Sequence, residues 1–155
     1  MIGKNYVALV SSFIHIPAPF RSQSGAALMT LCALLATGCG EKNVIRSYYP
    51  SGSVKTEAVA KDAVLNGRAV MLAESGQQMS EAEYRGGVLN GKSSAFFPDG
   101  KVKATAEYQD GALHGLSTAF HANGQKASEA QFYAGVLTGK SKSWTDTGAV
   151  VLDKP

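Results

Sequence analysis

Few residues of this 155-residue chain combine a reactive side chain with a spacing that supports chemistry. His114 and His121 are seven residues apart, and neither has a cysteine or histidine at metal-ligand spacing. The two cysteines, Cys32 and Cys39, both lie near one apolar segment and form neither a disulfide framework nor a metal motif. No Gly-x-Ser-x-Gly elbow is present. We therefore expect no catalytic residue, no metal site and no cofactor, and we expect that the chain is not an enzyme.

Carboxylates form the other candidate set, because they recur at a fixed spacing. Glu57, Glu81 and Glu129 share one position of a 24-residue period, and Glu83 and Glu107 share a second position. If each period is one pair of β-strands, equivalent residues lie two strands apart, roughly 9.6 Å. Ca²⁺ requires oxygens at about 2.3–2.6 Å, so these glutamates cannot share an ion. The rows are better interpreted as a solvated strand face than as a cation site.

Charge excludes one class of partner. The chain holds 15 basic and 12 acidic residues, and two of the basic residues, Lys4 and Arg21, precede Cys39. The remainder is nearly neutral, with 13 basic against 12 acidic residues. A dedicated nucleic-acid binder needs a basic stripe to neutralise phosphates. We expect no nucleic-acid partner.

The N-terminal part reads as an export signal. Residues 25–37 form an apolar run of 13 that follows Arg21. This run is shorter than the roughly 20 residues of a membrane-spanning helix, and its length is typical of a signal-peptide core. We assign residues 1–38 to a cleaved signal and exclude them from the fold.

The segment "LATGCG" that ends this run resembles the lipobox of bacterial lipoproteins. Small residues precede Cys39 and a polar stretch follows it, although Ala36 stands where the family prefers leucine. The resemblance implies acylation of Cys39, and Gly40 after it implies the outer membrane, facing the periplasm. The alternative is an ordinary signal peptide that leaves Cys39 as a stray thiol. Residues 39–47 are predicted to be a lipidated tether.

Glycines keep a period of 24 residues through the rest of the chain. "GVLNG" at 87–91 recurs as "GALHG" at 111–115 and "GVLTG" at 135–139, with a weaker "AVLNG" at 63–67. A second glycine recurs at 52, 76, 100, 124 and 148. Self-similarity at such a period indicates a repeat architecture.

Each repeat reads as one β-hairpin. "PDG" and "NG" between apolar stretches are typical hairpin turns. After the turn, residues alternate between an apolar side that includes Ala104, Ala106 and Tyr108 and a polar side that includes Lys103 and Glu107. We predict an all-β fold in which tandem hairpins stack into one elongated antiparallel sheet of about ten strands, roughly 43 Å long. The repeat domain is predicted to span residues 48–155, as four full repeats and a partial fifth.

Aromatic residues gather before the turns and give the candidate interaction surface. The adjacent pairs Tyr48–Tyr49 and Phe96–Phe97 must point to opposite faces of a strand, so one member of each is expected to be exposed. The candidate surface consists of Tyr49, Phe97, His121 and Trp144.

The pattern of glycines, aromatics and "E-x-[YF]" resembles the variant MORN repeat of bacteria. That resemblance implies an interaction or scaffold module, and some bacterial relatives carry an antitoxin label. We therefore expect a membrane-anchored scaffold that binds an envelope protein, a lipid or itself. The competing hypothesis is an immunity protein that neutralises an imported toxin, and an enzyme is the third.

Overall fold

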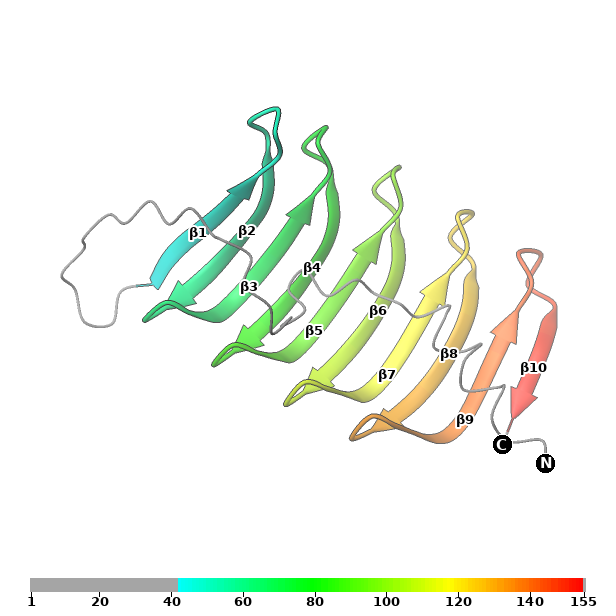
Figure 1. Cartoon of the computed structure of the whole chain (residues 1–155). Helices are drawn as coiled ribbons and strands as arrows, with labels where there is room; N and C mark the ends of the chain where they lie inside the picture. Colours follow the sequence, from blue (N-terminus) through cyan, green and yellow to red (C-terminus); the bar gives the residue numbers. More distant parts are fainter. Residues whose placement is uncertain (1–41, 155) are drawn as a thin grey trace.

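The computed structural model describes residues 42–154, and the predicted signal and Cys39 lie outside them. The described part is one ten-stranded antiparallel sheet in which every strand pairs with its neighbours in sequence (Figure 1). Its strands are β1 (Lys42–Tyr48), β2 (Val54–Lys61), β3 (Val64–Leu72), β4 (Gln78–Arg85), β5 (Val88–Phe96), β6 (Val102–Gln109), β7 (Ala112–Phe120), β8 (Lys126–Tyr133), β9 (Val136–Trp144) and β10 (Val150–Lys154). The predicted fold of stacked hairpins is confirmed. None of the described residues belongs to a helix long and apolar enough to cross a membrane.

Two kinds of turn alternate along the sheet, at its upper and lower edges in Figure 1. The upper turns (49–53, 73–77, 97–101, 121–125 and 145–149) each close with a backbone bond from the glycine to the residue three before it, as from Gly100 to Phe97 at 2.9 Å. The lower turns are residue pairs at 62–63, 86–87, 110–111 and 134–135, in which both residues have φ between +48° and +82°. That is the type I′ geometry that matches the twist of a hairpin.

The "NG" pairs form a turn at one of their three positions. Asn123–Gly124 lies in an upper turn, as predicted, whereas Asn66–Gly67 lies within β3 and Asn90–Gly91 within β5. Between two paired positions, Ala82↔Ser93 and Tyr84↔Leu89, β5 uses two more residues than β4. The positive φ of Gly91 therefore serves a bulge inside the strand, while the turn itself comes four residues earlier.

The predicted tether also differs from the structure. Residues 42–47 belong to β1, which pairs with β2 from Lys42↔Lys61 to Tyr48↔Val54. The sequence "KNVIRSY" is rich in strand-forming residues, and the edge of β2 would otherwise carry unpaired backbone groups. The ribbon thus begins and ends with a complete hairpin, which makes five hairpins in the described residues.

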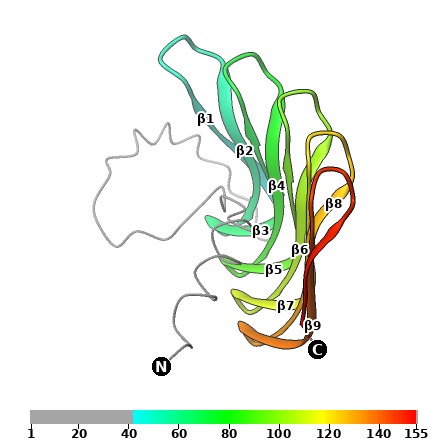
Figure 2. The ribbon, with the colours of Figure 1, turned by 90° about the vertical axis from the view of Figure 1, so that its right-hand side faces the viewer.

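A row of small side chains crosses one face of the sheet, which we call the alanine face. The row runs in register from β2 to β9, and every member is 5% exposed or less: Ala58, Ala69, Ala82, Ser93, Ala106, Ser117, Ala130 and Ser141. Leu65 and Leu89 pack against this row near the lower turns, where the strands bend (Figure 2).

The core is thin. Tyr84 is only 4% exposed, whereas Phe96, Phe120 and Trp144 are half-buried. Leu137, which occupies the same repeat position as the half-buried Leu65, is 42% exposed. A single sheet has no second layer to cover large side chains, so only small ones next to larger neighbours become fully buried.

Candidate functional site

The four residues that the sequence nominated lie in or next to the upper turns. Tyr49, Phe97 and His121 occupy the same position of the first, third and fourth upper turns, while Trp144 is the last residue of β9, one position earlier in the repeat. All four are half-buried. The exposed aromatic of this region is Tyr48, at 58%, and neither member of the Phe96–Phe97 pair is fully exposed. The expectation of one exposed member therefore holds for the first pair and is wrong for the second.

These side chains brace neighbouring turns. The Tyr49 hydroxyl donates to the carbonyl of Leu72 at 2.9 Å, and His121 Nε2 lies 2.9 Å from the carbonyl of Trp144. Because a carbonyl only accepts, Nε2 must carry the proton in this contact. Phe97 has the Lys103 ammonium 5.9 Å from its ring centroid. The bonds to carbonyls explain why the polar groups of Tyr49 and His121 are tolerated in half-buried positions. A binding role for the four residues stays a prediction.

Polar groups of the upper turns extend this bracing. Asn123 Nδ2 donates to the carbonyl of Asp146 at 2.6 Å, and Lys101 Nζ donates to that of Ala122 at 3.2 Å. Lys101 also bonds to Asp99, and that side-chain bond lowers the pKa of the Asp99 carboxyl. The upper edge is therefore a ladder of turn-to-turn bonds.

The lower turns carry an apolar row that sequence reasoning missed. Val64, Val88 and Val136 follow the first, second and fourth type I′ turns and are 44%, 44% and 64% exposed. Ala112 follows the third turn. Backbone bonds of 2.8 Å from Gly87 to Leu65, and equivalents along the chain, hold successive lower turns side by side. We call Val64, Val88, Ala112 and Val136 the lower row. In the sequence, the lower row is the second residue of each "GVLNG" copy, an apolar repeat that could have indicated an exposed surface.

Basic and aromatic side chains flank the lower row. Lys61 and Arg85 are the exposed residues just before the first two turns, and Tyr133 precedes the fourth at 64% exposed. The His114 ring lies 4.8 Å from that of Tyr133. Exposed apolar side chains with basic and aromatic neighbours form a surface suited to a partner protein or a lipid headgroup region.

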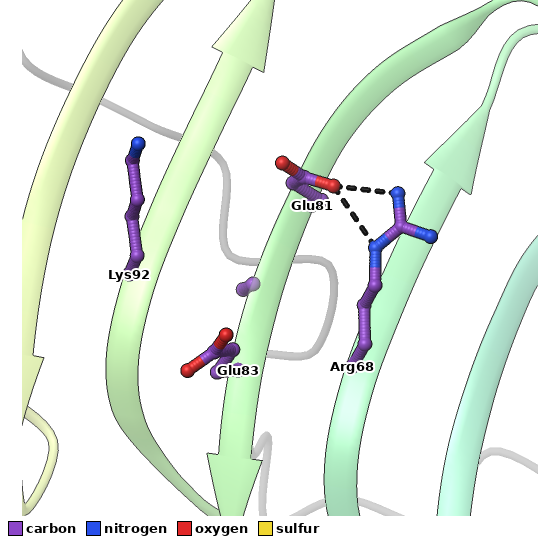
Figure 3. A pocket seen from close by; sticks show the side chains of 5 residues that line it. Arg68, Glu81, Glu83 and Lys92 are labelled. Carbon is purple, nitrogen blue, oxygen red and sulfur yellow. Dashed lines mark hydrogen bonds and ion pairs between the residues drawn. The ribbon is translucent and has the colours of Figure 1, made fainter.

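The glutamate rows lie on the face opposite the alanine row, as the alternation predicted. Glu57 accepts a 2.7 Å bond from Arg46, and Glu81 accepts 2.6 and 2.9 Å bonds from Arg68. In Figure 3, Arg68, Glu81, Glu83 and Lys92 project from three adjacent strands around a hollow of about 130 Å³. These are exposed surface pairs, each worth about 0–1 kcal/mol. Within the described residues, no group of three or more histidine, cysteine or acidic side chains is placed to hold a metal.

A second hollow, of about 370 Å³, lies between Lys92, Glu107, Tyr108 and His114. Burial raises the pKa of the Tyr108 hydroxyl above its ordinary value. The hollow is open and joins side chains of three neighbouring strands without an activated nucleophile among them. Its shape is that of a surface depression between hairpins.

Comparison with known proteins identifies the repeats. Residues 89–110 and 113–133 match the sequence model of the family described as "MORN repeat variant". No curated protein matches the chain.

Two of the solved structures that match the chain have low sequence identity to it. The crystal structure of accessory secretory proteins 1, 2 and 3 from Streptococcus pneumoniae is 13% identical with a TM-score of 0.39, over 87% of this chain. A GtfA/B complex bound to UDP and GlcNAc is 13% identical with a TM-score of 0.31, over 76%. In both cases the match spans 24% of the other chain.

Proposed function

We propose that this chain, which contains MORN-variant repeats, is a non-enzymatic scaffold anchored to the bacterial envelope, where it mediates protein or lipid interaction. The proposal places it at the outer membrane facing the periplasm, held by acyl groups on Cys39. MORN repeats generally take part in protein or membrane interaction, which supports the first half of the proposal. The export signal and the lipobox-like segment support the second half.

One observation carries the proposal: the lower row lies along the edge at which the chain enters the sheet. β1 starts at Lys42, which pairs with Lys61 beside the first lower turn. Cys39 is three residues earlier, a reach of roughly 10 Å at most. An acyl anchor at Cys39 would therefore hold the lower edge toward the bilayer, with Val64, Val88 and Val136 facing the membrane or a partner embedded in it.

The test is cross-linked capture of tagged full-length protein from membranes. Three forms are compared with the unsubstituted chain: Cys39→Ser, a lower-row triple variant (Val64→Ser, Val88→Ser, Val136→Ser) and a control triple variant (Met79→Ser, Val102→Ser, Leu116→Ser). The control removes apolar side chains that are 43%, 38% and 44% exposed and belong to inner strands, outside the lower row. We expect Cys39→Ser to leave the membrane fraction and the lower-row variant to lose its cross-linked protein or lipid.

The outcomes separate the two halves of the proposal. Equal loss in both triple variants would show that the lower row is not the interaction surface. Unchanged membrane association of Cys39→Ser would remove the anchor. Capture of nothing by any form would contradict the scaffold role.

A further inference from the structure

The two ends of the ribbon are complementary, because residues 42–154 form a whole number of hairpins. β1 begins the first hairpin and β10 ends the fifth, and within these residues neither strand has a partner on its outer edge. The free edge of β10 corresponds to the edge that β2, β4, β6 and β8 each present to the next hairpin. The free edge of β1 corresponds to the edge through which β3, β5, β7 and β9 each pair with the preceding hairpin.

The register of the inner junctions predicts what would meet at an end-to-end contact. At the β2·β3 junction, Glu57 lies opposite Val70, and at the β8·β9 junction Glu129 lies opposite Lys142. The 24-residue period relates these positions to the two ends of the sheet. Asp153 on β10 occupies the repeat position of Glu57 and Glu129, and Arg46 on β1 occupies that of Val70 and Lys142. A second copy whose β1 continues after β10 would therefore place Arg46 opposite Asp153, the same pairing of charges as Lys142 with Glu129.

Apolar side chains on the two edge strands are also more exposed than the residues at the same repeat positions of inner strands. Tyr48 is 58% exposed, whereas Leu72, Phe96 and Phe120 at the same repeat position are half-buried. Ile45 is 43% exposed, and its inner equivalents, Ala69 among them, are buried. On β10, Val150 and Val151 are 60% and 67% exposed. An end-to-end contact would cover residues on both edges.

We propose that copies of this chain associate head to tail, with β10 of one copy pairing antiparallel with β1 of the next. The contact joins two different surfaces and does not close, so it continues the sheet from copy to copy. This proposal identifies a second copy of the chain as one partner of the proposed scaffold. It depends on the two ends of the ribbon alone, and not on the Cys39 anchor or the lower row. The failure of the association would therefore leave the capture experiment above unaffected.

Disulfide trapping of the full chain in mild detergent tests the proposed register. Arg46→Cys and Asp153→Cys are combined in one chain, with Cys32→Ser and Cys39→Ser so that only the new thiols react. β1 and β10 are nine strand steps apart, roughly 43 Å, so a bond within one chain is impossible. We expect dimers, trimers and longer oligomers on oxidation. A mixture of the two single variants should stop at the dimer.

The matched control is Arg46→Cys with Val151→Cys, which moves one thiol two residues along β10. The two Cα atoms would then be more than about 7 Å apart, beyond the reach of a disulfide. Equal trapping in this control would overturn the proposed register. Dimers from Arg46→Cys alone, at the level of the pair, would indicate β1 pairing with β1 and would also overturn it.

Sedimentation of the chain without substitutions provides a measurement that does not depend on the variants. Head-to-tail association predicts a mass that rises with concentration and passes the dimer without a plateau. A constant monomer mass, or a plateau at the dimer, would contradict the proposal.

Discussion

At the residue scale, the second glycine of two "GxLxG" copies, Gly91 and Gly115, makes room for a glutamate side chain. Gly115 has φ of +109°, and a Cβ there would meet the side chain of Glu107 on the neighbouring strand. Gly124 in an upper turn has φ of +87° but nothing near a Cβ. A comparison of alanine substitutions at Gly115 and Gly124 therefore separates the cost of backbone strain from the cost of steric contact.

We expect Gly115→Ala to lower the free energy of unfolding by more than Gly124→Ala does. The strain common to both is about 1–2 kcal/mol, and the contact with Glu107 adds to the first alone. Chemical denaturation of both variants measures the difference, and adding Glu107→Ala should reduce it, because only the Cβ of residue 107, 3.2 Å from the added one, would remain. Equal costs in both variants would mean that the glutamate relaxes freely.

Tyr108 gives the fold a predicted response to alkali. Burial raises the pKa of its hydroxyl above the ordinary value of 10.0, so the folded protein keeps a proton that the unfolded chain loses. The stabilising contribution is complete below pH 10 and is lost as pH rises through the folded pKa. Tyr108→Phe should flatten the fall in stability between about pH 9 and 11. Urea unfolding across that range measures it, with the exposed Tyr133→Phe as control; parallel curves for Tyr108→Phe and the unsubstituted chain would contradict the assignment.

At the scale of elements, the type I′ turns differ in how well their residues suit them. Ala134 adopts φ of +48° and Ala63 adopts +61°, a region that disfavours every residue with a Cβ. We expect Ala134→Gly to stabilise the protein by about 1 kcal/mol. Ala112→Gly, which places glycine within β7, should instead destabilise by about 0.5–1 kcal/mol. Thermal unfolding compares the two, and the same sign for both would refute the turn assignment.

The turns also show how far sequence could predict these elements. The 24-residue period, the strand alternation around Ala104 and Ala106 and the "PDG" turn were all readable, because each follows from local chemistry. The "NG" pairs at 66–67 and 90–91 are not turns like the one at 123–124, since glycine with positive φ serves a bulge as readily as a turn. β1 was missed because "KNVIRSY" has no glycine signal of its own and becomes a strand through pairing with β2.

The candidate surface was harder to predict than the fold. Tyr49 and His121 were candidates for the interaction surface, yet they bond to the last residue of the strand before the next upper turn. Val64 and Val88 have unremarkable side chains, and only the stacking of turns aligns them along one edge. Exposure in a repeat ribbon depends on neighbours 24 residues away, which single residues do not reveal.

At the scale of the whole molecule, the ribbon should tolerate the loss of complete repeats. Each hairpin contacts only its neighbours, so stability is close to a sum of repeat and junction terms. Removal of residues 88–111, one full period, joins equivalent positions and should leave a folded sheet of eight strands with a lower Tm. Removal of residues 82–104, one residue less than a period, should instead prevent folding, because it turns Ala106 and Tyr108 to the opposite face of the joined strand. Circular dichroism and thermal melts compare the two deletions, and similar behaviour of both would contradict the repeat account.

The proposed anchoring of the whole molecule depends on where the mature chain begins. If the ribbon is held at the bilayer by its first strand, the protein extracted from membranes must start at Cys39 and carry acyl groups there. Intact-mass measurement of that protein is the most direct test. The account predicts a chain of residues 39–155 whose mass exceeds that of the peptide by its acyl groups. A chain cut elsewhere, or an unmodified Cys39, would contradict it.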